Sequence, residues 1–289
     1  MKRILILIFI AIIKLVLTGC EKPEDSGSNP VYAETEKKIR DEYDQYAVFT
    51  WSQYKELLNK LKQDKFIVLP LDEMRNTINA SKVVVGLRHD IDMNPFKALE
   101  MSDIEKSYGI RSTFFILATS EYYGHFNTSG VVRNKGMEQL YEELFNNGAE
   151  IGIHNDLLTV MIYYHLDPLA FNKKELSYYD SLNIPVHGTA AHGSALARAT
   201  LSNFNIFSDF ATKDSVEYLG MKYPLGQHSL KEFGFDYEAY FINFTVYYSD
   251  SGGQWNDPQG FNGILNKLEN SNPGERIEIL AHPDWWGKK

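Results

Sequence analysis

Short apolar runs alternate with helical patterns along the chain from residue 83 onward. Runs rich in β-branched and aromatic residues predict buried strands, and apolar residues spaced three and four apart predict helices. The strands are expected at residues 83–87, 111–117, 150–154, 184–193, 240–248 and 276–282. The helices are expected at 95–108, at about 137–147, from 168 onward, and near 261–269. These repeated strand–helix units predict an α/β fold with a mostly parallel sheet, and the length favours one barrel-like domain.

The division into strands and helices is less clear over residues 32–80. Thr50 and Gln53 have the spacing of a capping box at the start of a helix, and residues 66–71 predict a short strand. Residues 32–80 are therefore either an extension that caps the barrel or the first βα unit of the barrel itself.

Residues 1–20 have the pattern of an export signal. Lys2 and Arg3 precede an apolar run over 4–13, which is about half of the roughly 20 residues that a membrane-spanning helix needs. The ending LTGC resembles the lipobox of bacterial lipoproteins, in which the cysteine carries the lipid. A buried helix or a membrane anchor is the alternative. We expect a signal peptide ending at Cys20, a polar tether over 21–31, and a lipid-anchored protein of the cell envelope.

The composition limits the chemistry that the chain can use. Cys20 is the only cysteine, so a metal must be held by His, Asp or Glu if that residue is lipidated. The 29 basic and 38 acidic residues give a net charge of −9, which argues against non-specific binding to nucleic acid. The 18 Tyr, 17 Phe and 4 Trp would fill a core, and some could line a groove for ring-shaped ligands.

Ionisable residues collect where the predicted strands end. Arg88, Asp90 and Asp92 follow the strand at 83–87, and their spacing of two places them on one face. Two carboxylates held so close favour a shared proton or a bound cation. The alternative is a helix-capping cluster in which Arg88 neutralises Asp90. Other strand ends carry His154, Asp156, His192, Asp250 and His282. Since parallel strands end at one edge, a mixed Asp/His set there suits a divalent metal.

Five segments, in order, resemble motifs of the polysaccharide deacetylase (NodB-homology) superfamily. The segment RHDIDMNPFKALEM, followed by GIRSTFF, is similar to the first motif of a branch that reads Arg-His-Asp-hydrophobic-Asp. GAEIGIH resembles the second motif, and HGSALAR, SDSGGQW and LAHPDWW resemble later segments. The resemblance covers most of residues 83–287. It implies that residues 81–289 form a catalytic domain, a distorted (β/α) barrel with a metal site at its mouth.

The resemblance also implies roles for the matching residues. Asp90 would be the general base and His282 the general acid. Asp92 and His154 would bind a divalent metal, with zinc expected first and cobalt, manganese or nickel as alternatives. The metal would acidify water and polarise the acetamide carbonyl. Residues expected to support the site or to contact substrate are Arg88, Asp156, Asp250, Trp255 and Trp285.

The chain departs from the family pattern at two places. The second motif usually has another histidine four residues after the first, but Leu158 occupies that position and cannot bind a metal. His192 or Asp156 must then be the third ligand, and we favour His192 because imidazole is the commoner replacement and its strand is expected to be adjacent. The common third motif also supplies an arginine that orients the base. TAAHGSALAR lacks an arginine at the expected place, and Arg88 could replace it beside Asp90.

The expected function is a metal-dependent hydrolase that deacetylates an N- or O-acetylated polysaccharide or oligosaccharide at the cell envelope. A non-catalytic glycan-binding lipoprotein is one alternative, favoured by the absent histidine and the many aromatic residues. A hydrolase of a non-sugar C–N bond is another, because fold does not fix substrate. Base, ligand and acid candidates are all present, which favours an enzyme. The expected partners are a carbohydrate and, through Cys20, a membrane.

Overall fold

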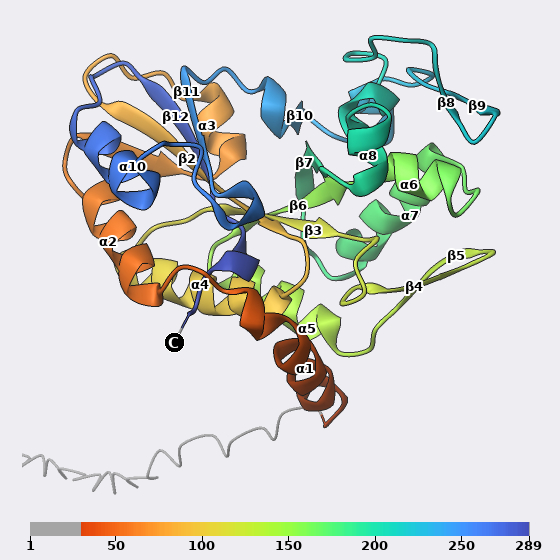
Figure 1. The fold of residues 1–289 in the computed structure, drawn as a ribbon, viewed down its shortest axis with the longest axis horizontal. Helices are drawn as coiled ribbons and strands as arrows, with labels where there is room; N and C mark the ends of the chain where they lie inside the picture. The colour runs from red at the N-terminus through yellow and green to blue at the C-terminus, as the bar shows by residue number, and fades with distance from the viewer. Residues whose placement is uncertain (1–29, 289) are drawn as a thin grey trace, which may run out of the picture.

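Eight strands form one parallel sheet whose spatial order differs from the order along the chain (Figure 1). The structure, a computed structural model, describes residues 30–288. The order is β10-β7-β6-β3-β2-β12-β11, with β1 beside β2. The strands are β1 (Phe66–Leu69), β2 (Val83–Ile91), β3 (Thr113–Leu117), β6 (Glu150–Asn155), β7 (Val186–Ala191), β10 (Tyr237–Glu238), β11 (Val246–Ser249) and β12 (Arg276–Leu280).

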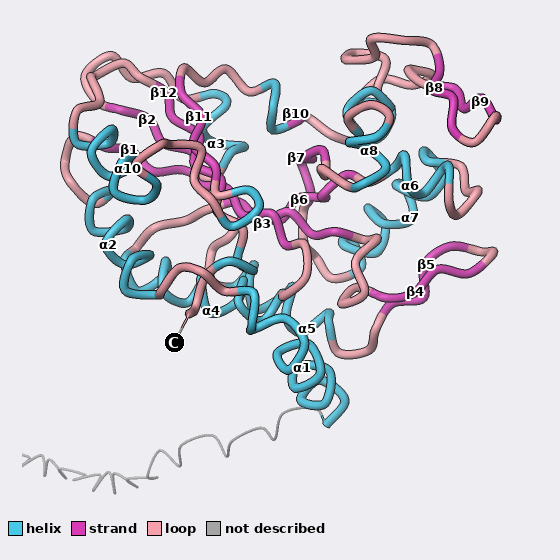
Figure 2. The backbone as a smooth tube through the Cα atoms, viewed as in Figure 1, coloured by secondary structure: helices cyan, strands magenta, loops and turns pink. Residues whose placement is uncertain are grey.

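Strand β2 is the centre of this sheet. One edge pairs with β12, while the other pairs first with β1 and then, over Arg88–Ile91, with β3. Among the described strands, β10 and β11 end the order and do not pair with each other. The sheet therefore curls without closing, with helices packed around it (Figure 2). This arrangement confirms the predicted α/β fold with a parallel sheet curved toward a barrel.

The helices begin and end largely where the sequence predicts. Thr50 and Gln53 form the expected capping box at the start of α2, and Asn94 caps α4, which ends at Gly109 with φ of 67°. Asp167 caps α7 by accepting a hydrogen bond from the amide of Ala170. The helices are α1 (Pro30–Tyr43), α2 (Trp51–Leu61), α3 (Leu71–Asn76), α4 (Pro95–Tyr108), α5 (Met137–Asn146), α6 (Leu157–Ile162), α7 (Pro168–Ser181), α8 (Ala195–Ala199), α9 (Leu230–Phe233) and α10 (Gly260–Glu269).

The segment before β2 contributes to the sheet as well as to its covering. Strand β1 pairs in parallel with the first half of β2, and α3 follows it directly. Helix α3 packs so closely on β2 that a Cβ at Gly86 would lie 2.3 Å from the sulfur of Met74. A larger residue here would force the side chains of Met74 and Leu71 to shift, so glycine allows α3 to approach the strand.

Two predicted strand boundaries were wrong. Strand β2 continues to Ile91 instead of ending at residue 87, because its polar side chains find buried partners and its backbone pairs with β3. The strand predicted over 240–248 begins only at Val246. The carboxylate of Glu238 accepts a hydrogen bond from the amide of Tyr240, and this cap starts a 3₁₀ turn where the sequence predicted extended chain.

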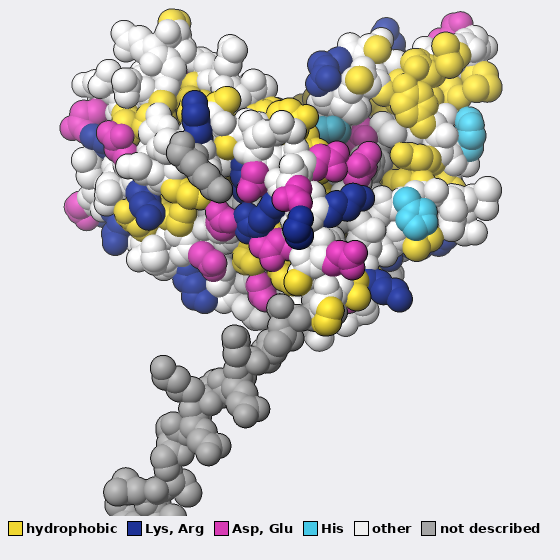
Figure 3. All heavy atoms as spheres, turned by 60° about the horizontal axis from the view of Figure 1, so that its bottom comes forward, with side chains coloured by type: hydrophobic (Ala, Val, Ile, Leu, Met, Phe, Trp, Pro, Cys, Tyr) yellow, Lys and Arg dark blue, Asp and Glu magenta, His cyan; other side chains and the backbone are white. Residues whose placement is uncertain are grey.

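Two hairpins lie outside the main sheet. They are β4 (Gly124–Asn127) with β5 (Gly130–Arg133), and β8 (Ser215–Tyr218) with β9 (Met221–Pro224). On the face shown in Figure 3, acidic and basic side chains are interspersed over the centre of the molecule. Within residues 30–288 no helix combines the length and the apolar character needed to cross a membrane. The predicted signal peptide and Cys20 lie outside the described residues.

Candidate active site

A cavity of about 500 Å³ opens at the carboxyl ends of β2, β6, β7 and β12. It is lined by ionisable side chains, all but Arg198 predicted at strand ends, together with glycines and aromatic residues. These side chains are Asp90, Asp92, His154, His192, Arg198 and His282, and the aromatic ones are Tyr240 and Trp285. The carboxyl edge of a parallel sheet is where βα folds build their sites, so this cavity is the candidate active site.

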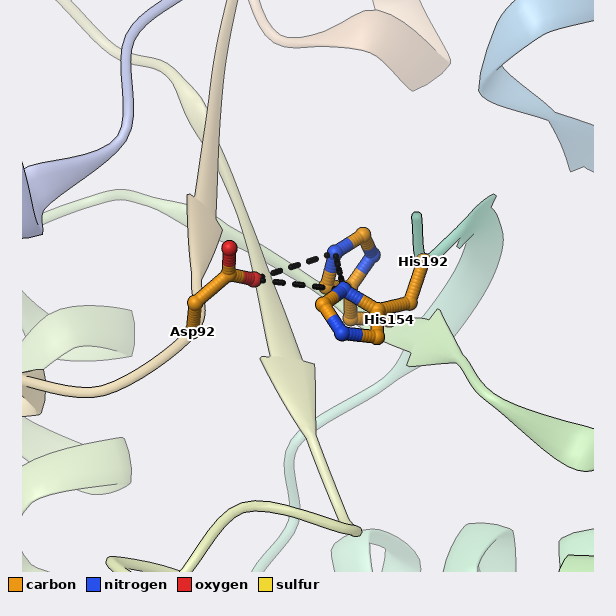
Figure 4. Close-up of side chains that lie close together, drawn as sticks. All are labelled: Asp92, His154 and His192. Atoms are coloured by element: carbon orange, nitrogen blue, oxygen red, sulfur yellow. Dashed lines mark hydrogen bonds and ion pairs between the residues drawn. The ribbon is translucent and has the colours of Figure 1, made fainter. Parts of the chain in front are cut away.

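Three of these side chains point at one another from different strands (Figure 4). Asp92 follows β2, His154 lies on β6, and His192 follows β7. Oδ1 of Asp92 lies 3.3 Å from Nε2 of His154 and 3.4 Å from Nδ1 of His192. The two ring nitrogens are 3.0 Å apart. The structure therefore brings His192, the favoured third ligand, next to both other ligand candidates.

This donor set fits a divalent metal. Tetrahedral ligands held about 2.0–2.1 Å from zinc are separated by roughly 3.3 Å, close to the spacing of the three atoms. Nδ1 of His154 donates to the carbonyl of Ala190 at 2.8 Å, which leaves the lone pair of Nε2 facing the cluster. Oδ1 of Asp92 is buried and has no hydrogen-bond partner among the described residues. Three protein ligands would leave a coordination position for water or substrate, as in catalytic sites.

The pKa shifts of Asp92 and His192 also suit a bound cation. Burial alone would raise the pKa of Asp92, but the neighbouring imidazoles of His154 and His192 hold that pKa well below its usual range. Burial alone would lower the pKa of His192, yet Asp92 raises it. Asp92 is thus an anion at neutral pH, and a bound metal would take the place of a proton on the imidazole of His192.

Asp90 is held beside this cluster by a buried arginine. Nε and Nη2 of Arg88 donate to the two carboxylate oxygens of Asp90, each at 2.8 Å. Nη1 of Arg88 donates to Glu278 at 3.0 Å, and the ring of Tyr240 lies 4.6 Å from the guanidinium carbon. Oδ2 of Asp90 is 3.5 Å from Nε2 of His154. Burial opposes ionisation of Asp90, but Arg88 outweighs it and lowers the pKa of this carboxyl.

His282 lines another part of the cavity and is paired with Asp250. Its Nδ1 lies 2.7 Å from Oδ1 of Asp250, which also accepts the backbone N–H of His282 at 2.9 Å. The other oxygen of Asp250 accepts the indole N–H of Trp286 at 2.9 Å. Burial by itself would lower the pKa of His282, but Asp250 outweighs burial and raises this pKa to about 9. His282 can therefore hold a proton on the cavity side at neutral pH.

Of the five residues expected to support the site, only Trp285 lines the cavity. Arg88 and Asp250 are paired with the lining residues Asp90 and His282, whereas Asp156 and Trp255 form no such pair. Asp156 turns away from the cluster and accepts hydrogen bonds from Thr119, Thr159 and Asn203, so it is not the third metal ligand in this arrangement. Trp255 is buried and packs against aromatic neighbours, so its contribution is to the core and not to substrate contact. Leu158 is fully buried on α6.

Two carboxylates that sequence analysis missed hold the site in place. Glu278 on β12 anchors the far side of Arg88 and is fully buried. Asp284 accepts backbone N–H groups from the loop that carries Asp92, at 3.3 Å from Asp92, 3.2 Å from Met93 and 2.6 Å from Asn94. An acidic residue inside the apolar run RIEIL was a usable sign of Glu278. No comparable pattern marks Asp284, because its partners are distant in sequence.

His89 does not line the cavity but supports the residues that do. The ring is fully buried, with Nδ1 2.8 Å from the carbonyl oxygen of Ala281 and Nε2 2.8 Å from Glu105. Ala281 immediately precedes His282. His89 therefore ties β2 to the backbone that positions the candidate acid.

Replacing Arg88 with lysine is expected to reduce turnover by tenfold or more while metal binding is unchanged. Lysine keeps the charge but cannot donate two parallel hydrogen bonds to Asp90, so the carboxylate would lose its fixed orientation. Metal content and kcat would be measured on the same preparation, with Arg133→Lys, which alters an ion pair to Glu175 outside the cavity, as the control. Equal losses of metal and turnover would rule out an orienting role for Arg88.

Comparisons with known proteins do not assign roles to the residues of the site. No model of a protein family matches the chain, and no curated protein matches its sequence. Among solved structures, the chain is similar to a family 4 carbohydrate esterase from Bacillus anthracis. The identity is 13%, the match covers 77% of this chain and 75% of that chain, and the TM-score is 0.32. A likeness at this level says nothing about individual residues.

Proposed function

We propose that the protein is a metal-dependent hydrolase that removes acetyl groups from an N- or O-acetylated polysaccharide or oligosaccharide. The observation that carries this proposal is the convergence of three groups on one cavity. A triad that could hold a metal, an oriented carboxylate and a carboxylate-paired histidine all line it. Hydrolysis of an acetyl amide or ester needs an activated water, a proton acceptor and a proton donor, and each group matches one of these needs.

Asp90 is suited to accept the proton of the attacking water. It is ionised, it is fixed by Arg88, and it lies beside His154 of the triad. A divalent ion held by Asp92, His154 and His192 would polarise the acetyl carbonyl and make water more acidic. Arg88 donates a hydrogen bond to each oxygen of Asp90 from one side. Only the remaining lone pairs of these oxygens can then accept a proton from the cavity.

His282 is suited to donate a proton to the departing amine or alcohol. Asp250 binds Nδ1, which fixes the ring and leaves Nε2 as the donor toward the cavity. A protonated imidazole stabilised by a buried carboxylate is a common arrangement for a general acid. Trp285 lines the cavity close to this histidine in sequence and offers an apolar surface for a sugar ring.

Activity is expected to decline at alkaline pH as His282 loses its proton. With a pKa of about 9 the imidazole is protonated at neutral pH, and the protonated fraction falls as pH rises through that value. Asp250→Asn removes the main partner that raises this pKa, so the alkaline limb of the kcat profile should move down by about one to two pH units. An alkaline limb that stays in place in Asp250→Asn would assign it to another group.

The proposal is tested by the products formed from two classes of substrate. Acetylated chito-oligosaccharides and acetylated xylo-oligosaccharides would be incubated with the zinc-, cobalt- and manganese-loaded protein, and free acetate would be measured. Cyclic amides would be offered in parallel, with ring opening as the readout. Acetate release that disappears in Asp90→Asn supports the proposal. Hydrolysis of the cyclic amides alone would replace it with a non-sugar C–N hydrolase.

We also propose that this reaction takes place at the cell envelope, with the domain held there by a lipid on Cys20. The support is the LTGC ending of the basic and apolar segment at 1–20. Acetylated envelope glycans would be substrates within reach of such an anchor.

A further inference from the structure

The rim of the cavity carries one cationic side chain that the proposed chemistry does not use. Arg198 lies on α8 and is exposed, and it lines the cavity that holds the triad. Its Nη1 donates to the carbonyl of Gly193, the residue that follows the metal-ligand candidate His192. The guanidinium is therefore held against the loop beside the triad, and its other N–H groups remain available.

Among the arginines of residues 30–288, Arg198 is the only exposed one that forms no ion pair with a carboxylate. Arg276 also lacks one, but it is buried and donates to the backbone carbonyls of Met74, Thr77 and Asn243. The remaining arginines are paired with Asp or Glu, and these are Arg40, Arg75, Arg88, Arg111 and Arg133. A guanidinium presents a planar fork of donors that matches carboxylate, phosphate and sulfate groups.

The guanidinium of Arg198 differs in charge from the carboxylates that line the same cavity. In the described part of the chain it is the only lysine or arginine that lines the cavity, whereas Asp90 and Asp92 contribute negative charge there. The whole protein carries a net charge of −9, so its general field repels anions. An anionic substrate would need a specific cation at the point where its charge is placed, and Arg198 supplies one.

We propose that Arg198 binds an oxyanion substituent of the acetylated glycan, so that the substrate class is an anionic acetylated sugar chain. This inference rests on the proposed function and adds the charge of the substrate to it. Because the guanidinium is fixed through Gly193 next to His192, the oxyanion belongs to the acetylated sugar or to its direct neighbour. A carboxylate, a phosphate ester and a sulfate ester share the required chemistry.

The test compares one neutral chain with three charged versions of the same chain. The probes are the N-acetylglucosamine tetramer and its forms that carry 6-carboxylate, 6-phosphate or 6-sulfate groups. Binding would be measured by calorimetry on the metal-loaded Asp90→Asn protein, and kcat/KM on the metal-loaded protein with Asp90 intact. Each is repeated with Arg198→Gln, Arg198→Lys and the control Arg111→Gln, which removes an exposed arginine away from the cavity.

Arg198→Gln is expected to weaken binding of at least one anionic probe by roughly 10- to 100-fold and to change the neutral probe less than about twofold. Arg198→Lys should recover part of that loss, because charge remains while the fork is lost. Arg111→Gln should leave all four probes unchanged. The anionic probe whose affinity falls most in Arg198→Gln identifies the oxyanion as carboxylate, phosphate or sulfate.

The two readouts separate this inference from the proposed function. Arg198-dependent binding of an anionic probe without turnover would support the inference and count against deacetylation. Turnover of the neutral tetramer, with equal effects of Arg198→Gln on neutral and charged probes, would support deacetylation and overturn the inference. Failure of every anionic probe to bind better than the neutral one would also overturn it.

Discussion

Replacing His192 with alanine is expected to abolish stoichiometric binding of a divalent metal. His192 contributes one of three donor atoms that lie within 4.8 Å of one another, and the other two come from Asp92 and His154. Loss of a direct ligand should weaken affinity by more than the roughly 10- to 100-fold that outer-shell changes cost. Asp92→Ala and His154→Ala should have the same effect, measured by elemental mass spectrometry after dialysis against limiting metal.

Asp156→Asn is the matched control for this prediction. Asp156 follows the same strand as His154 and was the alternative third ligand, but its carboxylate is engaged by Thr119, Thr159 and Asn203. This variant should keep about one metal per chain. Circular dichroism of each variant checks that the fold survives. Retention of metal by His192→Ala together with its loss in Asp156→Asn would reverse the assignment of the ligands.

Asp90→Asn is expected to reduce kcat by about 100- to 10,000-fold, the usual contribution of a positioned general base. Asparagine has nearly the same shape as aspartate and can still accept a hydrogen bond from Arg88, but its amide cannot take a proton from water. Metal content should be unchanged, because Asp90 is not one of the three clustered ligands. Steady-state acetate release on metal-loaded protein measures the effect.

Asp236→Asn serves as the control for loss of a carboxylate. Asp236 forms ion pairs with Lys231 and His187, away from the cavity lining. Its replacement should leave kcat within about twofold. If Asp90→Asn kept activity close to that of the unaltered protein, the base would have to be another group.

Local patterns in the sequence predicted much of the site because they depend only on strand geometry. The spacing of two put Arg88, Asp90 and Asp92 on one face, and the pairing of Arg88 with Asp90 follows directly from it. The position of His192 depended on β6 and β7 being neighbours. Those strands do pair, with His154 opposite Ala190.

Contacts between distant parts of the chain were beyond the reach of these patterns. Glu278 meets Arg88 and Asp284 meets the Asp92 loop across about 190 residues of sequence, and no periodicity encodes either contact. The predicted start of the strand at 240–248 was wrong for a different reason. Apolar and aromatic residues favour a strand there, but the side chain of Glu238 offers the backbone a competing hydrogen bond.

The most direct test of the account is a titration of metal-free protein with zinc or cobalt while acetate release from an acetylated oligosaccharide is measured. Activity is predicted to be absent without metal and to rise until about one metal is bound per chain. His192→Ala should remain inactive at the same metal concentrations. Acetate release that persists without metal would contradict the account, as would tight glycan binding with no acetate release at any metal concentration.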